Sequence, residues 1–376
     1  EDKSDSKEGE WRIILDVLLK TDPSTLFMIT RKMIYYLSHY KDVSFEGIMT
    51  GLCPIDSRDS AWCGINIPNP RSDIDALRRV EESVFDLAKN SLESSEILDL
   101  ITLWLRQSKT RPLLFASEKP NISRSEITDI LNQYLSVPIS ERFLSLEDGM
   151  TIRTNLIRRF LTSRLEYLNI AKKYLRVEDF AEIMGSMTGP SKGVGTLGGK
   201  ASGIILAEKI IRKKMENKGD LKRVVFARSW YITSDTMRDF INYNTLEEVA
   251  HIKYFEPAEI RNEQPFLEQM FKNGVFPQEI VNGLKDILRE AGETPLIVRS
   301  SSHLEDSFGA AFSGKYKSLF ITNQGSFEER LRSLEDAIAE VWASTFNPNA
   351  IQYRKERGML DLLEYMGVII QEVVGK

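Results

Sequence analysis

Cysteine and histidine are scarce in this sequence of 376 residues, which holds two cysteines and three histidines. Two cysteines cannot build a disulfide framework or a four-cysteine zinc site, so a reducing cytoplasm is the expected compartment. Cys53 and Cys63 are also too far apart for a redox C-x-x-C motif, and buried structural thiols are the better interpretation. The three histidines, His39, His251 and His303, limit any mechanism that depends on imidazole.

Long hydrophobic runs and an excess of positive charge are absent as well. No apolar stretch approaches the ~20 residues that span a bilayer, and the polar, acidic residues 1–10 do not resemble a secretory signal. The 55 Asp and Glu residues outnumber the 50 Lys and Arg residues, which gives a net charge of −5. We therefore expect no binding of nucleic acid or of an anionic membrane through bulk charge.

The distribution of glycine divides the chain into two parts. Residues 1–180 hold five glycines, whereas the next 23 residues hold seven. We therefore predict a boundary near residue 180, between a helical N-terminal domain (1–180) and a second domain (181–376). A hydrophobic content of 42% is ordinary for globular domains.

The first domain has the apolar spacing of helices, most clearly in residues 73–107 and, over the longest stretch, in residues 151–175. Residues 112–115 are the one stretch that favours a short strand, and residues 52–70 are expected to form a loop. Capping signals predict three helix starts along the chain: Asp22 with Pro23, Ser123 with Glu126, and Ser326 with Glu329.

The second domain alternates strands with helices. Strands are predicted near residues 223–233, 296–299, 317–322 and 366–374. The fold class is thus a mainly α N-terminal region followed by an α+β lobe. Because the last predicted strand is apolar throughout and the chain stops just after it, we expect partner strands beyond the sequence given.

A glycine-rich loop, residues 193–198, matches the pattern G-x-G-x-x-G. A dinucleotide-binding loop needs a strand directly before it, and residues 187–192 do not have the pattern of a strand. What remains is a glycine-rich turn that leads into a helix, whose first amides favour an anion. Lys200 lies in the first turn of that helix. It is either a phosphate contact or a solvated lysine in an interdomain linker.

Two further segments have the residues to hold phosphate. Residues 309–316 nearly match G-x-x-x-x-G-K-[ST], but Tyr316 replaces the Ser or Thr that would hold magnesium. The segment is either a hairpin over phosphates or an ordinary turn. Arg299 ends a buried strand, where it either grips phosphate oxygens in bidentate fashion or pairs with Glu305 or Asp306. His303 is interpreted as a loop histidine, since no partner base is evident.

Seven motifs in sequence order carry a resemblance to a known family: 198–202 (GGKAS), 229–233 (SWYIT), 298–301 with 305–306 (VRSS, ED), 311–314 (AFSG), 341–346 (VWASTF), 351–354 (IQYR) and 368–374 (VIIQEVV). Together they resemble the nucleotide-binding domain of phosphoenolpyruvate synthase and pyruvate, phosphate dikinase, over about residues 185–376. Glucan, water dikinase and rifampicin phosphotransferase share that domain.

The resemblance implies an ATP-grasp fold, incomplete in this chain, with ATP held between two lobes and Mg²⁺ bound to ligands outside the sequence given. It implies that Lys200 and Arg299 contact the ATP phosphates, that a loop from Gly309 to Gly314 covers them, and that one late strand leads to the adenine. The ATP-binding positions so implied are Gly198, Gly199, Lys200, Arg299, Ser300, Gly309, Gly314, Gln371, Glu372 and Val374.

Three residues depart from the family's pattern. Ser302 stands where Ala is usual, Phe308 where Pro is frequent, and Lys315 where Gln is frequent. The family's swivelling histidine domain and its phosphoenolpyruvate- or pyruvate-binding domain are expected outside this chain. The leading hypothesis is therefore the ATP-binding portion of a phosphoenolpyruvate synthase-like dikinase, unable to complete the reaction alone. The alternatives are a nucleotide-binding regulatory module and a helical interaction protein without catalysis.

Overall fold

A computed structural model describes residues 2–41, 43, 74–138, 144–217, 224–304, 314–361 and 364–375. By their internal contacts the residues form two compact units. Unit 1 comprises Glu1–Pro112 and Val137–Ser145, and unit 2 comprises Leu113–Ser136 and Leu146–Lys376. The boundary near residue 180 falls inside unit 2, and the division into domains at that point stays a prediction. The predicted loop at 52–70, with both cysteines, lies outside the described residues.

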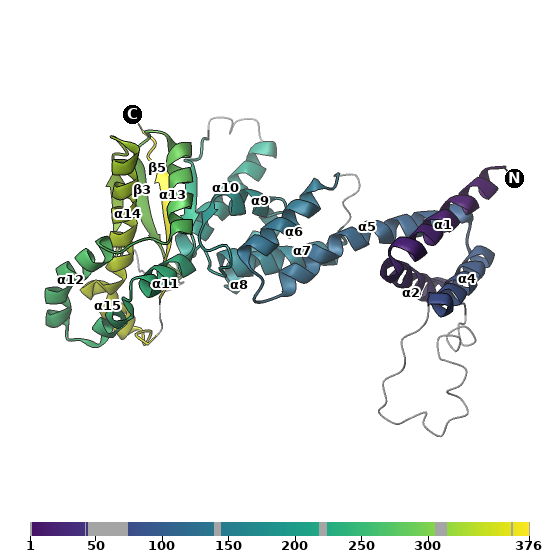
Figure 1. Ribbon diagram of the computed structural model, residues 1–376, viewed down its shortest axis with the longest axis horizontal. Helices are drawn as coiled ribbons and strands as arrows, with labels where there is room; N and C mark the ends of the chain where they lie inside the picture. The colour runs from purple at the N-terminus through teal and green to yellow at the C-terminus, as the bar shows by residue number, and fades with distance from the viewer. Residues whose placement is uncertain are drawn as a thin grey trace, which may run out of the picture. The chain divides into compact units, whose positions relative to one another are not determined.

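Unit 1 is helical in its described part (Figure 1). It contains α1 (Asp2–Thr21), α2 (Pro23–Tyr40), α4 (Ile74–Ser91) and most of α5 (Ser94–Glu118). The predicted start of α2 is confirmed, because the Asp22 carboxylate accepts a hydrogen bond from the Thr25 amide at 3.1 Å. Apolar faces of the helices meet in one core that includes Trp11, Met33 and Phe85.

The short strand predicted at residues 112–115 is wrong, because these residues belong to α5. Proline inside a helix costs about 3 kcal/mol, yet the helix continues past Pro112. The continued helix buries Leu113 and Ala116, which are 1% and 3% exposed. Burial of an apolar face thus outweighs the local preference of proline.

Unit 2 begins with a helical layer that leads to the sheet. Its elements are α6 (Arg124–Ser136), α7 (Leu146–Leu156), a π-helical turn η4 (Ile157–Leu161), α8 (Leu165–Tyr174) and α9 (Asp179–Gly185). The capping box of Ser123 and Glu126 is confirmed by reciprocal hydrogen bonds of 3.0 and 3.2 Å. The unbroken helical pattern predicted for 151–175 is wrong at Thr162, whose backbone is extended.

The sheet has five strands: β1 (Met187–Thr188), β2 (Ser229–Ile232), β3 (Leu296–Ser301), β4 (Ser318–Ile321) and β5 (Gly367–Glu372). Their order is β1-β2-β5-β3-β4, and only the β1–β2 pair is parallel. The expectation that β5 lacks partner strands is wrong, because β5 pairs with β2 on one side and with β3 on the other. The two-residue strand β1 was also missed, since the sequence predicts none at 187–192.

One face of the sheet packs against a helical layer. The elements of this part of unit 2 are α10 (Gly199–Asn217), α11 (Ser234–Tyr243), η6 (Glu247–Tyr254), α12 (Pro257–Lys272), α13 (Gln278–Ala291), α14 (Phe327–Ala343), η7 (Ser344–Phe346) and α15 (Pro348–Glu356). Leu296 and Val298 of β3 join a large core with residues of α11 to α14. The capping box of Ser326 and Glu329 is confirmed at the start of α14.

The other face of the sheet is partly open. Strand alternation turns Ile297 and Arg299 away from the core that holds Leu296 and Val298, and both are half-buried. Opposite Ile297 on the neighbouring strand lies Phe320, which is 72% exposed. This face therefore keeps apolar and cationic surface in contact with solvent.

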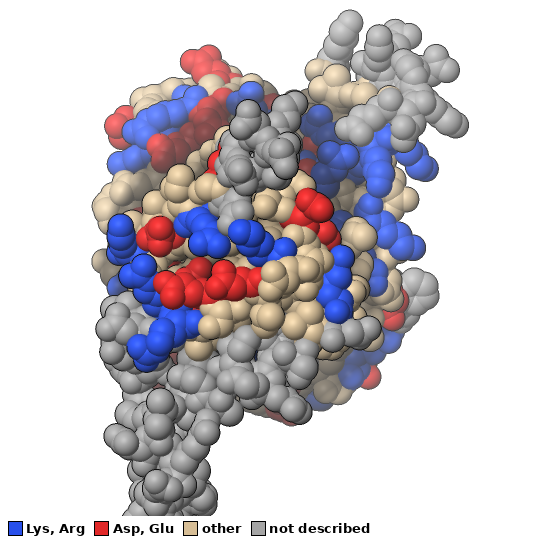
Figure 2. Space-filling view, turned by 90° about the vertical axis from the view of Figure 1, so that its right-hand side faces the viewer, with Lys and Arg blue, Asp and Glu red and all other residues tan. Residues whose placement is uncertain are grey.

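The surface carries both signs of charge. On the face in Figure 2, Lys and Arg side chains lie beside Asp and Glu side chains. Among the described residues, no helix combines the length and the apolar character that a bilayer crossing requires.

Candidate phosphate-binding cleft

The start of α10 lies directly against the end of β3. Gly198 has a φ of +81°, and a Cβ at this position would come within 1.8 Å of the Ser301 carbonyl oxygen. Only glycine combines the left-handed backbone with this close approach. The glycine at 198 therefore brings residues about 100 positions apart in sequence, Lys200 and Ser300, into one neighbourhood.

The first amides of α10 are already bonded to β3. The Gly199 N–H donates to the Ser302 carbonyl at 3.1 Å, and the Ala201 N–H donates to the Ser301 hydroxyl at 3.0 Å. These two amides are thus not available to an anion, in contrast to what a glycine-rich turn before a helix suggests. An anion at this site would therefore have to be held chiefly by side chains.

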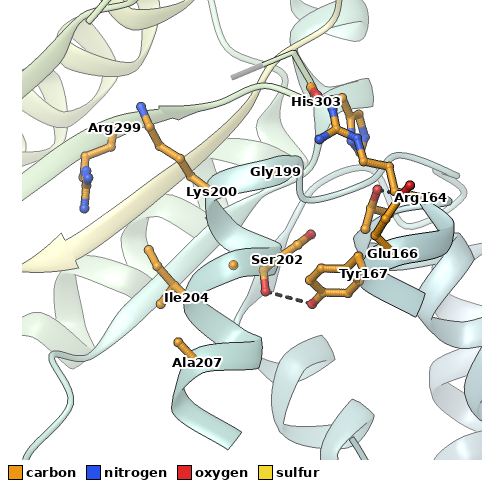
Figure 3. A pocket seen from close by; sticks show the side chains of 12 residues that line it. Arg164, Glu166, Tyr167, Gly199, Lys200, Ser202, Ile204, Ala207, Arg299 and His303 are labelled. Atoms are coloured by element: carbon orange, nitrogen blue, oxygen red, sulfur yellow. Dashed lines mark hydrogen bonds between the residues drawn. The ribbon is translucent and has the colours of Figure 1, made fainter. Parts of the chain in front are cut away.

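Lys200 and Arg299 line one cleft of about 770 Å³. Lys200 extends from the start of α10 toward the strand that carries Arg299 (Figure 3), and its Nζ donates to the Ser300 hydroxyl at 3.1 Å. Gly199 also lines the cleft, whereas Gly198 and Ser300 are buried beneath it. The cleft therefore brings two cationic side chains from separate elements to one surface.

Arg299 is half-buried and makes no hydrogen bond or ion pair with any residue in the described ranges. The alternative partners named from the sequence, Glu305 and Asp306, lie outside the described residues. Burial of a guanidinium is costly without a counter-charge. A planar fork of donors in a cleft suits the oxygens of a phosphate or carboxylate group.

The helical layer supplies the opposite wall of the cleft, through Arg164 and Tyr167, which sequence reasoning missed. The Tyr167 hydroxyl donates to the Ser202 carbonyl at 2.8 Å (Figure 3), and burial raises the pKa of this phenol. Arg164 donates to the His303 carbonyl. No sequence motif predicts these residues, because their place in the cleft depends on the interruption of the helix at Thr162.

His303 also lines this wall, with its Nε2 2.5 Å from the Thr196 hydroxyl. Burial, followed by the charge of Arg164, lowers the pKa of His303 below its usual 6.5. The neutral imidazole is thus favoured. The histidine acts here as a contact between the glycine-rich loop and the residues that follow β3.

The remaining glycines of the G-x-G-x-x-G pattern approach a carboxylate. A Cβ at Gly193 or Gly195 would come within 2.2 or 2.1 Å of the Asp235 side chain. The Gly195 amide donates to Asp235 at 2.8 Å. The first part of the pattern therefore fits a buried carboxylate, and only its last glycine fits the cleft.

Residues 194–376 match the family model described as pyruvate phosphate dikinase, AMP/ATP-binding domain. The matched segment, just under half of the chain, is similar to that domain. The match begins inside the glycine-rich loop and includes Lys200, Arg299 and β5. It excludes unit 1 and the helical layer of α6 to α9.

Two curated proteins are similar to the chain over part of its length. A rifampicin phosphotransferase of Streptomyces sviceus is 24% identical over 174 residues, which are 44% of this chain and 19% of that protein. A rifampicin phosphotransferase of Bacillus subtilis is 28% identical over 131 residues, which are 34% of this chain and 14% of that protein. The chain thus matches less than a fifth of the length of either relative.

In the AMP/ATP-binding domain, strand alternation separates the late positions of β5. Gln371 pairs with Ile297 and so shares the open face with Arg299, and its amide donates to the Ser229 hydroxyl at 2.8 Å. Glu372 faces the other way and lies 3.8 Å from Arg228. Val374 follows the strand and is 70% exposed. None of the three lines the cleft at Lys200.

The loop expected over the phosphates is described only at its end. Gly309 lies outside the described residues. Gly314 is exposed with a φ of +76°, which fits a turn. The described part of the domain holds no group of three or more His, Cys, Asp or Glu side chains that could bind a metal ion.

Proposed function

We propose that residues 194–376 bind ATP in an ATP-grasp-like lobe and hold its phosphates at Lys200 and Arg299. The observation that carries this proposal is the cleft itself. It gathers an ammonium held at 3.1 Å from Ser300 and a guanidinium with no partner in the described ranges. The AMP/ATP-binding family of this segment gives independent support for the nucleotide.

The open face of the sheet supports a place for the base. Gln371, Ile297 and Arg299 lie on that face in neighbouring register positions. If the adenine of ATP lies along β5, it would contact Ile297 and the Gln371 amide while the phosphates of ATP contact Arg299. The family resemblance alone supports an ATP-binding role for four further residues: Gly309, Gly314, Glu372 and Val374.

The reaction in this proposal is phosphoryl transfer from ATP to a histidine on a domain outside this chain. Catalysis of phosphoryl transfer rests on positioning and on stabilisation of the phosphoryl charge. Lys200 and Arg299 would supply cationic donors to the phosphate oxygens. Mg²⁺, held by ligands outside this chain, would neutralise further charge on ATP.

Calorimetry with ATP and Mg²⁺ tests the site. We expect the Lys200→Ala/Arg299→Ala double variant to bind at least ~100-fold more weakly, because each hydrogen bond to a charged group is worth about 1.5–3 kcal/mol. The matched control is Lys214→Ala/Arg289→Ala, which removes two exposed cations of unit 2 outside the cleft. Equal affinity of the two double variants would contradict the proposal, as would absence of binding by the unaltered chain.

A further inference from the structure

A second cavity, of about 220 Å³, lies in unit 2 among α11, η6, η7 and α15. It shares no lining residue with the cleft at Lys200. At ~30 Å³ per water, its volume equals that of about seven water molecules. The cavity thus admits a small organic molecule and excludes a nucleotide. Apolar side chains form much of its wall: Met237, Ile241, Leu246 and Phe346.

Lys253 lines this cavity and is only 8% exposed. Its ammonium makes no hydrogen bond or ion pair with another residue in the described ranges. It lies over the ring of Tyr254, with 5.0 Å from Nζ to the ring centroid. The side chain is therefore largely buried, and its ammonium has no counter-charge in the described ranges. An anion in the cavity would supply that counter-charge.

The acidic residues of the cavity do not supply that counter-charge. Glu364 accepts hydrogen bonds from the Ser302 and Tyr316 hydroxyls, and its carboxylate lies 3.6 Å from Arg354. Glu247 lines the cavity but is exposed to solvent.

Two more donors in the wall lack acceptors. The Thr345 hydroxyl and the Arg354 Nε are buried and have no hydrogen-bond partner within the described part of the chain. Both residues line the same cavity as Lys253. Buried donors are normally satisfied. Two buried donors without an acceptor thus lie around the same small space as the Lys253 ammonium. The chemistry of the wall is that of a receptor for an acceptor-rich, negatively charged group.

We propose that this cavity binds a small monocarboxylate, with its carboxylate at Lys253 and its apolar body against Met237, Ile241 and Leu246. A single carboxylate matches the one ammonium in the wall of this cavity. A doubly charged phosphate ester fits less well, because its second charge would be repelled by Glu247. The ligand is thus an apolar organic acid of few atoms.

Ligand-observed NMR on the full chain tests this site with benzoate and with benzyl alcohol, which has a similar shape and no charge. We expect saturable binding of benzoate and binding of benzyl alcohol at least ~10-fold weaker, since a hydrogen bond to a charged group is worth that much. Equal affinity for the two probes would overturn the proposal, as would absence of benzoate binding.

Two lysine variants and one control locate the binding. Lys253→Met keeps the length of the side chain and should weaken benzoate binding about 10-fold or more, whereas Lys253→Arg should retain it. Lys355→Met, on the exposed side of α15, should leave it unchanged. Thermal melting of each variant reports whether it folds. Retained affinity in a folded Lys253→Met variant would overturn the proposal.

Competition with ATP separates this site from the proposed nucleotide site. Because the cavity and the cleft share no residue, a saturating amount of ATP should not displace benzoate. Displacement would show that benzoate occupies the cleft at Lys200 and would overturn the proposal. Failure of ATP binding leaves the benzoate result standing, so the two proposals fail separately.

Discussion

The buried ion pair of Arg354 and Glu364 allows a quantitative test of unit 2. Their side chains are 3% and 7% exposed and lie 3.6 Å apart. Glu364→Gln removes the counter-charge at nearly constant size. Arg354 then keeps only neutral partners such as the Thr345 carbonyl, to which it donates at 2.5 Å. Removal of one member of a buried pair costs about 3–5 kcal/mol.

We expect a loss at the lower end, about 3 kcal/mol, because the Arg354–Glu364 distance exceeds the ~2.8 Å of a good charge-assisted hydrogen bond. Two compact units need not unfold in one transition, so a single melting temperature is a poor measure. Hydrogen exchange of the β3 and β5 amides, which the centre of the sheet protects, reports the stability of unit 2 alone.

Two controls accompany this measurement. Glu263→Gln removes an exposed carboxylate on α12 and should change stability by less than about 0.5 kcal/mol. The double variant Arg354→Met/Glu364→Gln removes both charges and should recover most of the loss. The reasoning is refuted if Glu364→Gln costs less than about 1 kcal/mol. It is also refuted if the double variant loses as much stability as Arg354→Met and Glu364→Gln lose together when their separate losses are added.

Two further predictions concern the cleft. Gly198→Ala places a Cβ within 1.8 Å of the Ser301 carbonyl at a φ of +81°, so it should lower the melting temperature of unit 2 by several degrees. Gly203 lies in the helix that follows, α10, and a Cβ there would meet nothing within 4 Å. Gly203→Ala should therefore raise the stability of unit 2 by about 0.5–1 kcal/mol. Burial and then Arg164 lower the pKa of His303, so the stability from its neutral form is complete above pH 6.5 and lost as the pH falls through the folded-state pKa. The slope of stability against pH between 7 and 5 should therefore flatten in His303→Gln, and an unchanged slope would contradict this assignment.

The sequence predicts best those elements whose signals are local. Asp22, Ser123 and Ser326 mark helix starts because a capping side chain bonds within one turn of itself. Strands near β2 to β5 were also predicted from the sequence. For the helix starts the determining contacts lie within a few residues, so pattern and structure agree.

The sequence fails where distant contacts decide. Residues 112–115 stay helical because of the burial of Leu113, and Thr162 interrupts a helical pattern that continues on both sides. The position of β5 in the middle of the sheet depends on pairing with β2 and β3, which apolar character alone does not specify. Each error thus arises from tertiary contacts that override a local pattern.

The cleft follows the same rule. Lys200 was singled out because it lies in the first turn of a helix that follows a glycine-rich loop. Arg299 was singled out because it lies at the predicted end of a buried strand. That they line one cleft depends on the fit of Gly198 against Ser301, which spacing cannot reveal. Arg164 and Tyr167 have no sequence signal, since their place in the wall comes from the folding of a separate layer.

Arg299 and Arg354 differ in whether an acidic residue compensates the charge of the guanidinium. Both lie in the segment that matches the AMP/ATP-binding domain, and the sequence does not say which arginine contacts a ligand. Arg354 is almost fully buried and has Glu364 at 3.6 Å, so its charge is compensated within the fold. Arg299 is half-buried on an open sheet face and has no such partner in the described ranges. An arginine held at that partial burial without compensation lowers the stability of the free protein. In the proposed site, a phosphate at Arg299 would supply this compensation, which Glu364 already supplies at Arg354.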